Sequence, residues 1–168
     1  RSSAAIVLGN SGDLRWVDLL VRGYRDPERV VEKACRLAVS ALVDAFREAP
    51  DRLSRYRYHI DLRGMRERAG LDDNDLTTHF QHYALMQLFG RPGLSFGTEI
   101  EFRQAAAAEM AGPRGLLALR FVGDLERAQV VREGGAARAE VAGHLLVELV
   151  PSGVPLTPRI EASASAPV

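Results

Sequence analysis

The stretch RYRYHIDLRG, residues 55–64, alternates between two kinds of side chain. Every second residue is aromatic or aliphatic: Tyr56, Tyr58, Ile60 and Leu62. The residues between them are charged or polar: Arg55, Arg57, His59, Asp61 and Arg63. Because successive side chains of a strand point to opposite faces, this period predicts a half-buried β-strand with a charged face. Such a strand belongs to a sheet whose apolar face needs a cover.

Two helices are predicted, one on each side of this strand. The first spans residues 27–48, because Asp26 suits the N-cap, Pro27 suits the first helical position, and Pro50 ends the pattern. Its apolar residues form one broad stripe at the 3.6-residue period: Val30, Val31, Ala34, Leu37, Ala38, Ala41, Leu42 and Ala45. The second helix spans residues 74–89 and is ended by GRPG. We interpret the first helix as scaffold.

Strands are predicted for most of the remaining chain. The opening AAIVLGNSGDLRWVDLL holds two apolar runs around a turn cluster, which favours a hairpin. The alternative of a strand, a glycine turn and a helix would direct backbone amides at a phosphate, but a P-loop ending is absent. Beyond Gly93 the runs TEIEFRQ, GLLALRFV, RAQVVRE and ARAEVAGHLLVELV alternate, with turns expected at Gly123-Asp124 and Gly134-Gly135. This pattern predicts an antiparallel meander.

These elements predict a single α+β domain over residues 1–150. In this two-layer fold a mostly antiparallel sheet, made of the N-terminal hairpin and the C-terminal meander, packs on the two main helices. The sheet residues expected to face the helices are Tyr56, Tyr58, Ile60, Ile100, Phe102, Leu145, Val147 and Leu149. Residues 151–168 are rich in Pro, Ser and Ala, which predicts a loosely ordered tail.

The charge composition is balanced, with 22 basic and 22 acidic residues and a formal net charge of zero. Nucleic acids and anionic membranes are held by an excess of Lys and Arg, so this balance argues against both partners. Lys33 is the only lysine. With the abundant Ala, Gly and Val, this arginine-rich usage indicates the coding bias of a GC-rich bacterial genome.

Cys35 is the only cysteine, which excludes an internal disulfide and a multi-cysteine zinc site. Its place on the apolar stripe favours a buried, inert thiol over a nucleophile. No apolar run reaches the roughly 18–20 residues that span a bilayer, and no signal peptide is visible. We therefore expect a cytoplasmic location, and we predict no cofactor. The chain begins at Arg1 rather than methionine, so we expect a trimmed or processed form.

His79 and His82 lie three residues apart on the second predicted helix. Metal sites use that spacing, but with carboxylates from facing helices, and zinc proteases use a different one, so no metal site is predicted. An acid–base role is a further alternative. The inner face of this helix is expected to hold Leu76, Phe80, Tyr83, Ala84 and Leu88. A second, partly apolar side predicts a contact surface formed by His79, His82, Leu85, Met86 and Phe89.

The polar face of the first strand is the second candidate site. If the sheet closes over a cavity, Asp61 could orient His59 as a general base, and Arg57 could hold an anion. The alternative is a solvated face of mixed charge, which is common in antiparallel sheets. No nucleophile elbow, Cys–His pair, zinc-deaminase pattern or calcium loop is present, which weighs against an enzyme.

The sequence therefore favours a non-catalytic interaction, assembly or regulatory domain. We expect it to form a homo-oligomer or to bind a partner protein through the surface that includes Met86. The alternative is a small-molecule-binding domain or an enzyme whose acid–base site, His59 and Asp61, lies on the polar face of the sheet.

Overall fold

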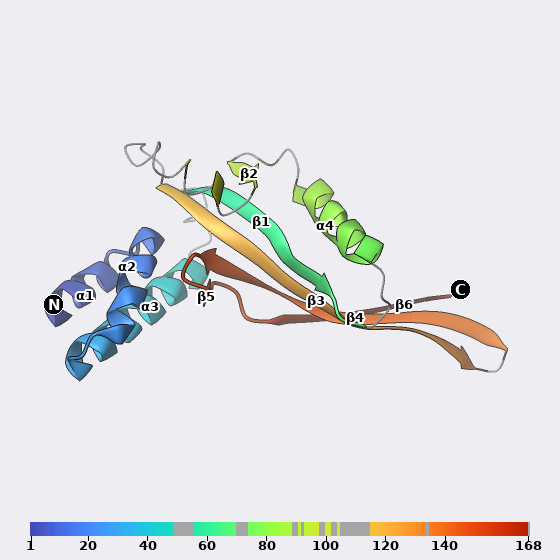
Figure 1. Cartoon of the computed structure of the whole chain (residues 1–168). Coiled ribbons are helices and arrows are strands. Elements are labelled where there is room, and N and C mark those ends of the chain that lie inside the picture. The colour runs from blue at the N-terminus through green and yellow to red at the C-terminus, as the bar shows by residue number, and fades with distance from the viewer. Residues whose placement is uncertain are drawn as a thin grey trace.

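The structure is a computed structural model that describes residues 1–48, 56–69, 74–88, 93–97, 115–133 and 135–167, together with residues 91, 100, 101 and 104. These residues form helices and a mixed sheet of six strands, which confirms the α+β class. Helices α1 to α3 gather at one end of the molecule, and the β3–β4 hairpin projects at the other (Figure 1). Within the described residues, no helix is long and apolar enough to cross a membrane.

The N-terminal segment is helical, so the predicted hairpin is wrong. It consists of α1 (Ser2–Asn10), a 3₁₀ turn (Leu14–Trp16), α2 (Val17–Arg22) and a second 3₁₀ turn (Gly23–Arg25). The β-branched residues of this segment favour strands locally, but tertiary packing overrides that preference. A Cβ at Gly9 of α1 would lie 2.8 Å from the Cα of Ala38, so the two backbones are in close contact. Val17 is fully buried in the core.

The first predicted helix is confirmed as α3 (Arg29–Glu48). It begins two residues later than expected, and the Asp26 carboxylate accepts a hydrogen bond from the backbone N–H of Glu28 at 3.0 Å. Its buried residues are Val31, Cys35, Ala38, Val39, Leu42 and Val43. Val30 and Leu37 are 71% and 62% exposed. The predicted stripe is therefore buried on one side only.

The sheet is mixed, which corrects the prediction of a mostly antiparallel one. The elements are β1 (Tyr56–Glu67), α4 (Asn74–Leu88), β2 (Leu94–Phe96), β3 (Gly115–Glu133), β4 (Ala136–Val150), β5 (Val154–Pro155) and β6 (Ile160–Pro167). The strand order is β2-β1-β3-β4-β5, and β6 pairs with β4. β1 is parallel to β2 and β3, whereas β4 is antiparallel to its neighbours. The α4 crossover carries the chain back so that β2 runs in the direction of β1, which a hairpin cannot do.

Three local predictions for the second half of the chain differ from the structure. Ile100, Glu101 and Gln104 are helical, where the strand TEIEFRQ was expected. β3 runs through the expected turn because Gly123 is paired on both sides, with Met65 of β1 and with Leu145 of β4. The expected loose tail contains β5 and β6, because strand pairing uses backbone groups that small side chains leave accessible.

The core joins the helical end to one face of the sheet. Tyr58 is paired with Leu117, and Leu119 is paired with both Ile60 and Leu149. These residues are buried with Tyr56, Val17, Leu42 and Leu156. Leu62, Leu88, Phe121 and Val147 pack against them. Of the residues predicted to face the helices, Leu145 is half-buried, Ile100 is 68% exposed, and Phe102 lies outside the described residues.

Burial in this core raises the pKa of Tyr58 to about 12, with a smaller contribution from neighbouring Tyr56. Between pH 10 and pH 12 the unfolded chain loses this proton while the folded chain keeps it, so stability falls as the pH rises. We expect the wild type to lose on the order of 2 kcal/mol over this interval relative to Tyr58→Phe. Urea unfolding of both proteins at pH 8 and pH 12 measures the difference. Equal losses in the two proteins would contradict this prediction.

Candidate functional site

The two residues of the predicted acid–base pair are both buried on β1, and they contact different side chains. His59 is 7% exposed, and its Nδ1 lies 3.1 Å from the Ser95 hydroxyl on β2. Asp61 is 3% exposed, and its carboxylate accepts hydrogen bonds from Arg63 at 2.9 Å and Arg120 at 3.2 Å. Arg57, the predicted anion-binding residue, is exposed. The Asp61 carboxylate is thus engaged by two guanidinium groups.

The electrostatics of Asp61 suit an ion pair. Burial alone would raise the pKa of this carboxyl group, but hydrogen bonds from the side chain and backbone of Arg63, together with Arg120, outweigh burial and lower the pKa. Asp61 is therefore held as a carboxylate that pairs with its arginines.

The predicted contact residues of α4 differ in their exposure to solvent. His79 and His82 are exposed, and Met86 is 58% exposed. Leu85 is half-buried, and Phe89 lies outside the described residues. Tyr83, expected on the inner face, is 65% exposed. At 3.6 residues per turn, His79, His82, Tyr83 and Met86 occupy one side of the helix, and we call these four residues the α4 ridge.

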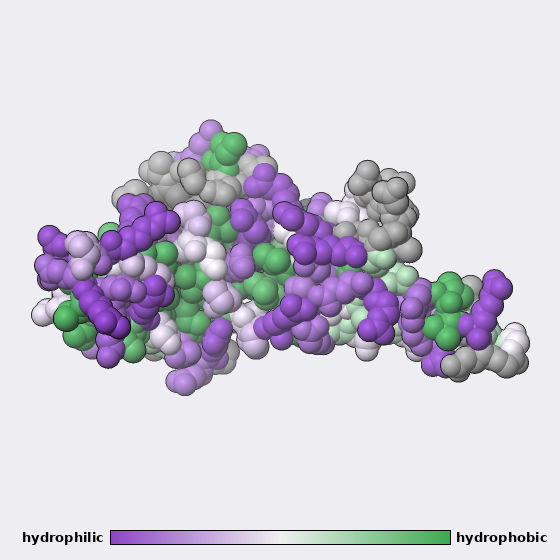
Figure 2. All heavy atoms as spheres, turned by 60° about the horizontal axis from the view of Figure 1, so that its bottom comes forward, coloured by the Kyte–Doolittle hydropathy of each residue, from purple (hydrophilic) through white to green (hydrophobic). Residues whose placement is uncertain are grey.

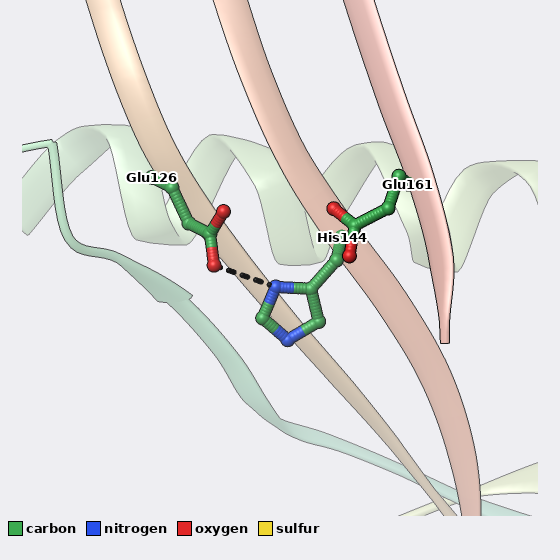
Figure 3. Close-up of side chains that lie close together, drawn as sticks. All are labelled: Glu126, His144 and Glu161. Atoms are coloured by element: carbon green, nitrogen blue, oxygen red, sulfur yellow. Dashed lines mark hydrogen bonds and ion pairs between the residues drawn. The ribbon is translucent and has the colours of Figure 1, made fainter. Parts of the chain in front are cut away.

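A second cluster, which the sequence analysis did not single out, lies where β3, β4 and β6 run side by side (Figure 3). His144 of β4 is paired directly with Asp124 of β3 on one side and Glu161 of β6 on the other. Directly paired residues share a face of the sheet. Glu126 is the extra residue of a β-bulge between Leu125 and Arg127, and its Oε1 lies 3.0 Å from His144 Nδ1.

The cluster contains three carboxylates, one imidazole and two arginines. The His144 and Asp124 side chains are 7% and 12% exposed, whereas those of Glu126 and Glu161 are 45% and 63% exposed. Arg159 bridges the two glutamates, with Nη2 2.7 Å from Glu126 Oε1. Arg68 Nε lies 3.1 Å from Asp124 Oδ1. Within the described residues, Glu126, His144 and Glu161 form the group whose ligand atoms, all within 4.8 Å of one another, could hold a metal ion.

The helical end carries an open groove of about 940 Å³ between α1 and α3. Its apolar lining includes Ile6, Val30 and Leu37, all more than half exposed. The charged lining residues are Arg29, Glu32, Lys33 and Arg36. Arg36 pairs with Glu32 at 2.9 Å, so the groove keeps a net positive rim. Apolar residues interrupt the hydrophilic surface at this end and on the projecting hairpin (Figure 2).

No protein family model matches this chain, and no curated protein matches it. Among solved structures, the chain is similar to the lipoprotein GNA1162 from Neisseria meningitidis, with 9% sequence identity and a TM-score of 0.41. That similarity covers 66% of this chain and 83% of the lipoprotein chain. A likeness of this strength carries no inference about function.

Proposed function

We propose that the chain is a non-catalytic assembly domain that self-associates through the α4 ridge, so that the ridges of two copies pack together. The carrying observation is the chemistry of that surface. The exposed side chains described on α4 are Thr78, His79, His82, Tyr83, Met86 and Gln87, and none of them is Lys, Arg, Asp or Glu. In a chain with 26% charged residues, an uncharged exposed helix surface is a marked departure.

A second copy of the chain suits this surface chemically. Aromatic residues and methionine are enriched in protein interfaces, and charged residues are depleted from interface cores. A two-fold contact brings the same patch of both copies together, which repels when the patch carries one sign of charge. The α4 ridge contains no Lys, Arg, Asp or Glu and therefore avoids that penalty.

The size of the α4 ridge limits the expected affinity of self-association. A helix of 15 residues is about 22 Å long. Stable interfaces bury roughly 800 Å² on each partner, which is more than one ridge of a short helix supplies. We therefore expect a weak, concentration-dependent dimer.

The α1–α3 groove is less suited to self-association. Its rim carries Arg29 and Lys33 in addition to the Arg36–Glu32 pair. Two such grooves facing each other would bring positive charges together, which is unfavourable in a closed interface.

The geometry of Asp61 supports the acid–base alternative less well than the assembly proposal. Its carboxylate is paired with Arg63 and Arg120, and its pKa is lowered. The alternative assigns this carboxylate the role of orienting His59, but the carboxylate is engaged by two arginines, which favours the non-catalytic proposal.

Sedimentation velocity over a wide concentration range tests the assembly proposal. We expect the wild type to dimerise with increasing concentration and Met86→Glu to remain a folded monomer, because the new carboxylate would be buried against a ridge that contains no Lys or Arg. Val30→Glu is the matched control: it places the same charge at another exposed aliphatic position, on α3, and should dimerise like the wild type. A wild type that is monomeric at the highest concentration, or equal behaviour of the two variants, would overturn the proposal.

A further inference from the structure

We infer that Glu126, His144 and Glu161 form a binding site for one divalent transition-metal ion, for which zinc is the best-suited candidate. The three residues come from three strands that are adjacent in the sheet, and their side chains converge (Figure 3). One imidazole and two carboxylates are ligand types that zinc accepts, with a water molecule able to complete a tetrahedral site. The inference is independent of self-association through α4.

The pairing register fixes two of the ligands in place. His144 and Glu161 are directly opposed on β4 and β6, so the ladder brings their side chains to the same face. The bulge in β3 leaves Glu126 without a cross-strand partner, and its carboxylate turns to the imidazole. Bulges often re-aim a side chain in this way beside functional sites.

The distances between the ligand atoms are close to those around a single zinc ion, and small side-chain movements would complete the site. Zinc bonds to nitrogen and oxygen are about 2.0–2.2 Å long, so two ligand atoms on one ion lie about 3.4 Å apart in a tetrahedral arrangement. His144 Nδ1 and Glu126 Oε1 are already 3.0 Å apart. The Glu161 carboxylate falls within the same 4.8 Å group. Its side chain is 63% exposed, so it can change conformation to reach the ion.

Asp124 is placed to support the imidazole from its other side. When Nδ1 of a histidine binds a metal, the proton resides on Nε2, and that N–H is commonly donated to a carboxylate. Asp124 Oδ2 lies 3.9 Å from His144 Nε2, and Arg68 contacts the other oxygen of the same carboxylate. A shift of about 1 Å would complete the carboxylate–histidine–metal arrangement.

Arg159 is the competitor that the ion has to displace. Its guanidinium bridges Glu126 and Glu161, so without a metal it neutralises the two carboxylates. The Arg159 side chain is 50% exposed, and the residue lies just before β6 rather than within it, so it can turn into solvent. The site therefore contains its own counter-charge, and removal of that charge should strengthen metal binding.

Bound metal would also fasten β6 to the sheet. Every residue of β6 is exposed, and Glu161 is its contribution to the ligand group. Few side-chain contacts then hold this strand beyond its backbone pairing with β4. A bond from Glu161 through the ion to β3 and β4 would protect the amides of β6 from hydrogen exchange.

Titration of the full chain with zinc chloride against a chromogenic chelator tests the site. We expect one equivalent to bind, Glu161→Gln to weaken the affinity at least about tenfold, and Arg159→Met to strengthen it. His82→Ala should leave the affinity unchanged, which excludes the histidines of α4 as the ligands. Glu161 and Arg159 are exposed enough for both variants to fold, which circular dichroism checks. Hydrogen exchange in β6 should slow when zinc is added.

Three outcomes would overturn the inference. The first is the absence of stoichiometric zinc binding by the wild type. The second is equal affinity in the wild type and Glu161→Gln. The third is loss of binding in His82→Ala, which would assign the ion to α4.

Discussion

Asp61→Asn is expected to lower the free energy of unfolding by about 3 kcal/mol, because it removes one partner from a buried ion-pair cluster. The Asp61 side chain is 4% exposed and faces both Arg63 and Arg120. The asparagine keeps the size of the side chain but removes the negative charge that faces the two guanidinium groups. The Arg63 side chain is 57% exposed and can recover water, which places the effect at the lower end of the range for buried pairs.

The matched control is Asp44→Asn on α3. Asp44 lies 3.7 Å from Arg47 in an i,i+3 pair, and its side chain is 57% exposed. A surface pair of this kind contributes about 0–1 kcal/mol. Urea unfolding at pH 7 compares both variants with the wild type. If the two substitutions lowered the free energy of unfolding equally, the ion pairs of Asp61 would contribute no more than a surface pair.

The effect of Asp61 should also depend on pH in a defined direction. Its pKa is lowered in the folded state, so its contribution is present above the ordinary aspartate pKa and is lost as the pH falls through the folded value. The stability difference between the wild type and Asp61→Asn should therefore shrink on acidification below about pH 4. A stability difference that already shrank near neutral pH would contradict this prediction.

The elements that were predicted correctly are those whose signal is local. The stripe of α3, the alternation of β1 and the periodicity of α4 each lie within one contiguous segment. The described ends of α3 and α4 agree with the prediction within two residues, and β1 continues three residues beyond the predicted stretch. Side-chain period in such a segment follows directly from backbone geometry.

The elements that were missed depend on partners distant in the chain. The N-terminal segment holds β-branched residues, and its helical state depends on the contact of Gly9 with Ala38. The glycine at position 123 suggested a turn because nothing local shows that β1 and β4 pair with it on both sides. The alternation of Ala and Ser in β6 is too weakly amphipathic to indicate a strand, and its place in the sheet follows from pairing with β4.

The Glu126–His144–Glu161 cluster could not be predicted from the sequence for the same reason. Glu161 lies in the stretch that composition assigned to a loose tail, and its position opposite His144 follows from the β4–β6 register. Glu126 joins the cluster through a bulge, which no pattern in the sequence marks. His59 and Asp61, in contrast, were neighbours on one strand, and the sequence could show their shared face but not the arginine that reaches Asp61 from β3.

Leu42→Ala is expected to lower the free energy of unfolding by about 2–5 kcal/mol, because it leaves a cavity in a packed core. Leu42 is 1% exposed and lies in the cluster that joins α3 to the sheet. The same buried cluster includes Tyr58 and Leu119 of the sheet. A loss of this size would show that Leu42 is closely packed in this core.

Leu37→Ala is the control that separates the loss of core packing from an effect on the helix itself. It makes the same substitution on the same helix, so any change in helix propensity cancels, but Leu37 is 62% exposed. We expect its effect to stay within about 0.5 kcal/mol. Chemical unfolding should be measured at a low protein concentration, where association does not stabilise the fold. Equal losses for the two variants would mean that the whole apolar stripe is buried, as its period alone predicts, and would leave no open groove beside α1.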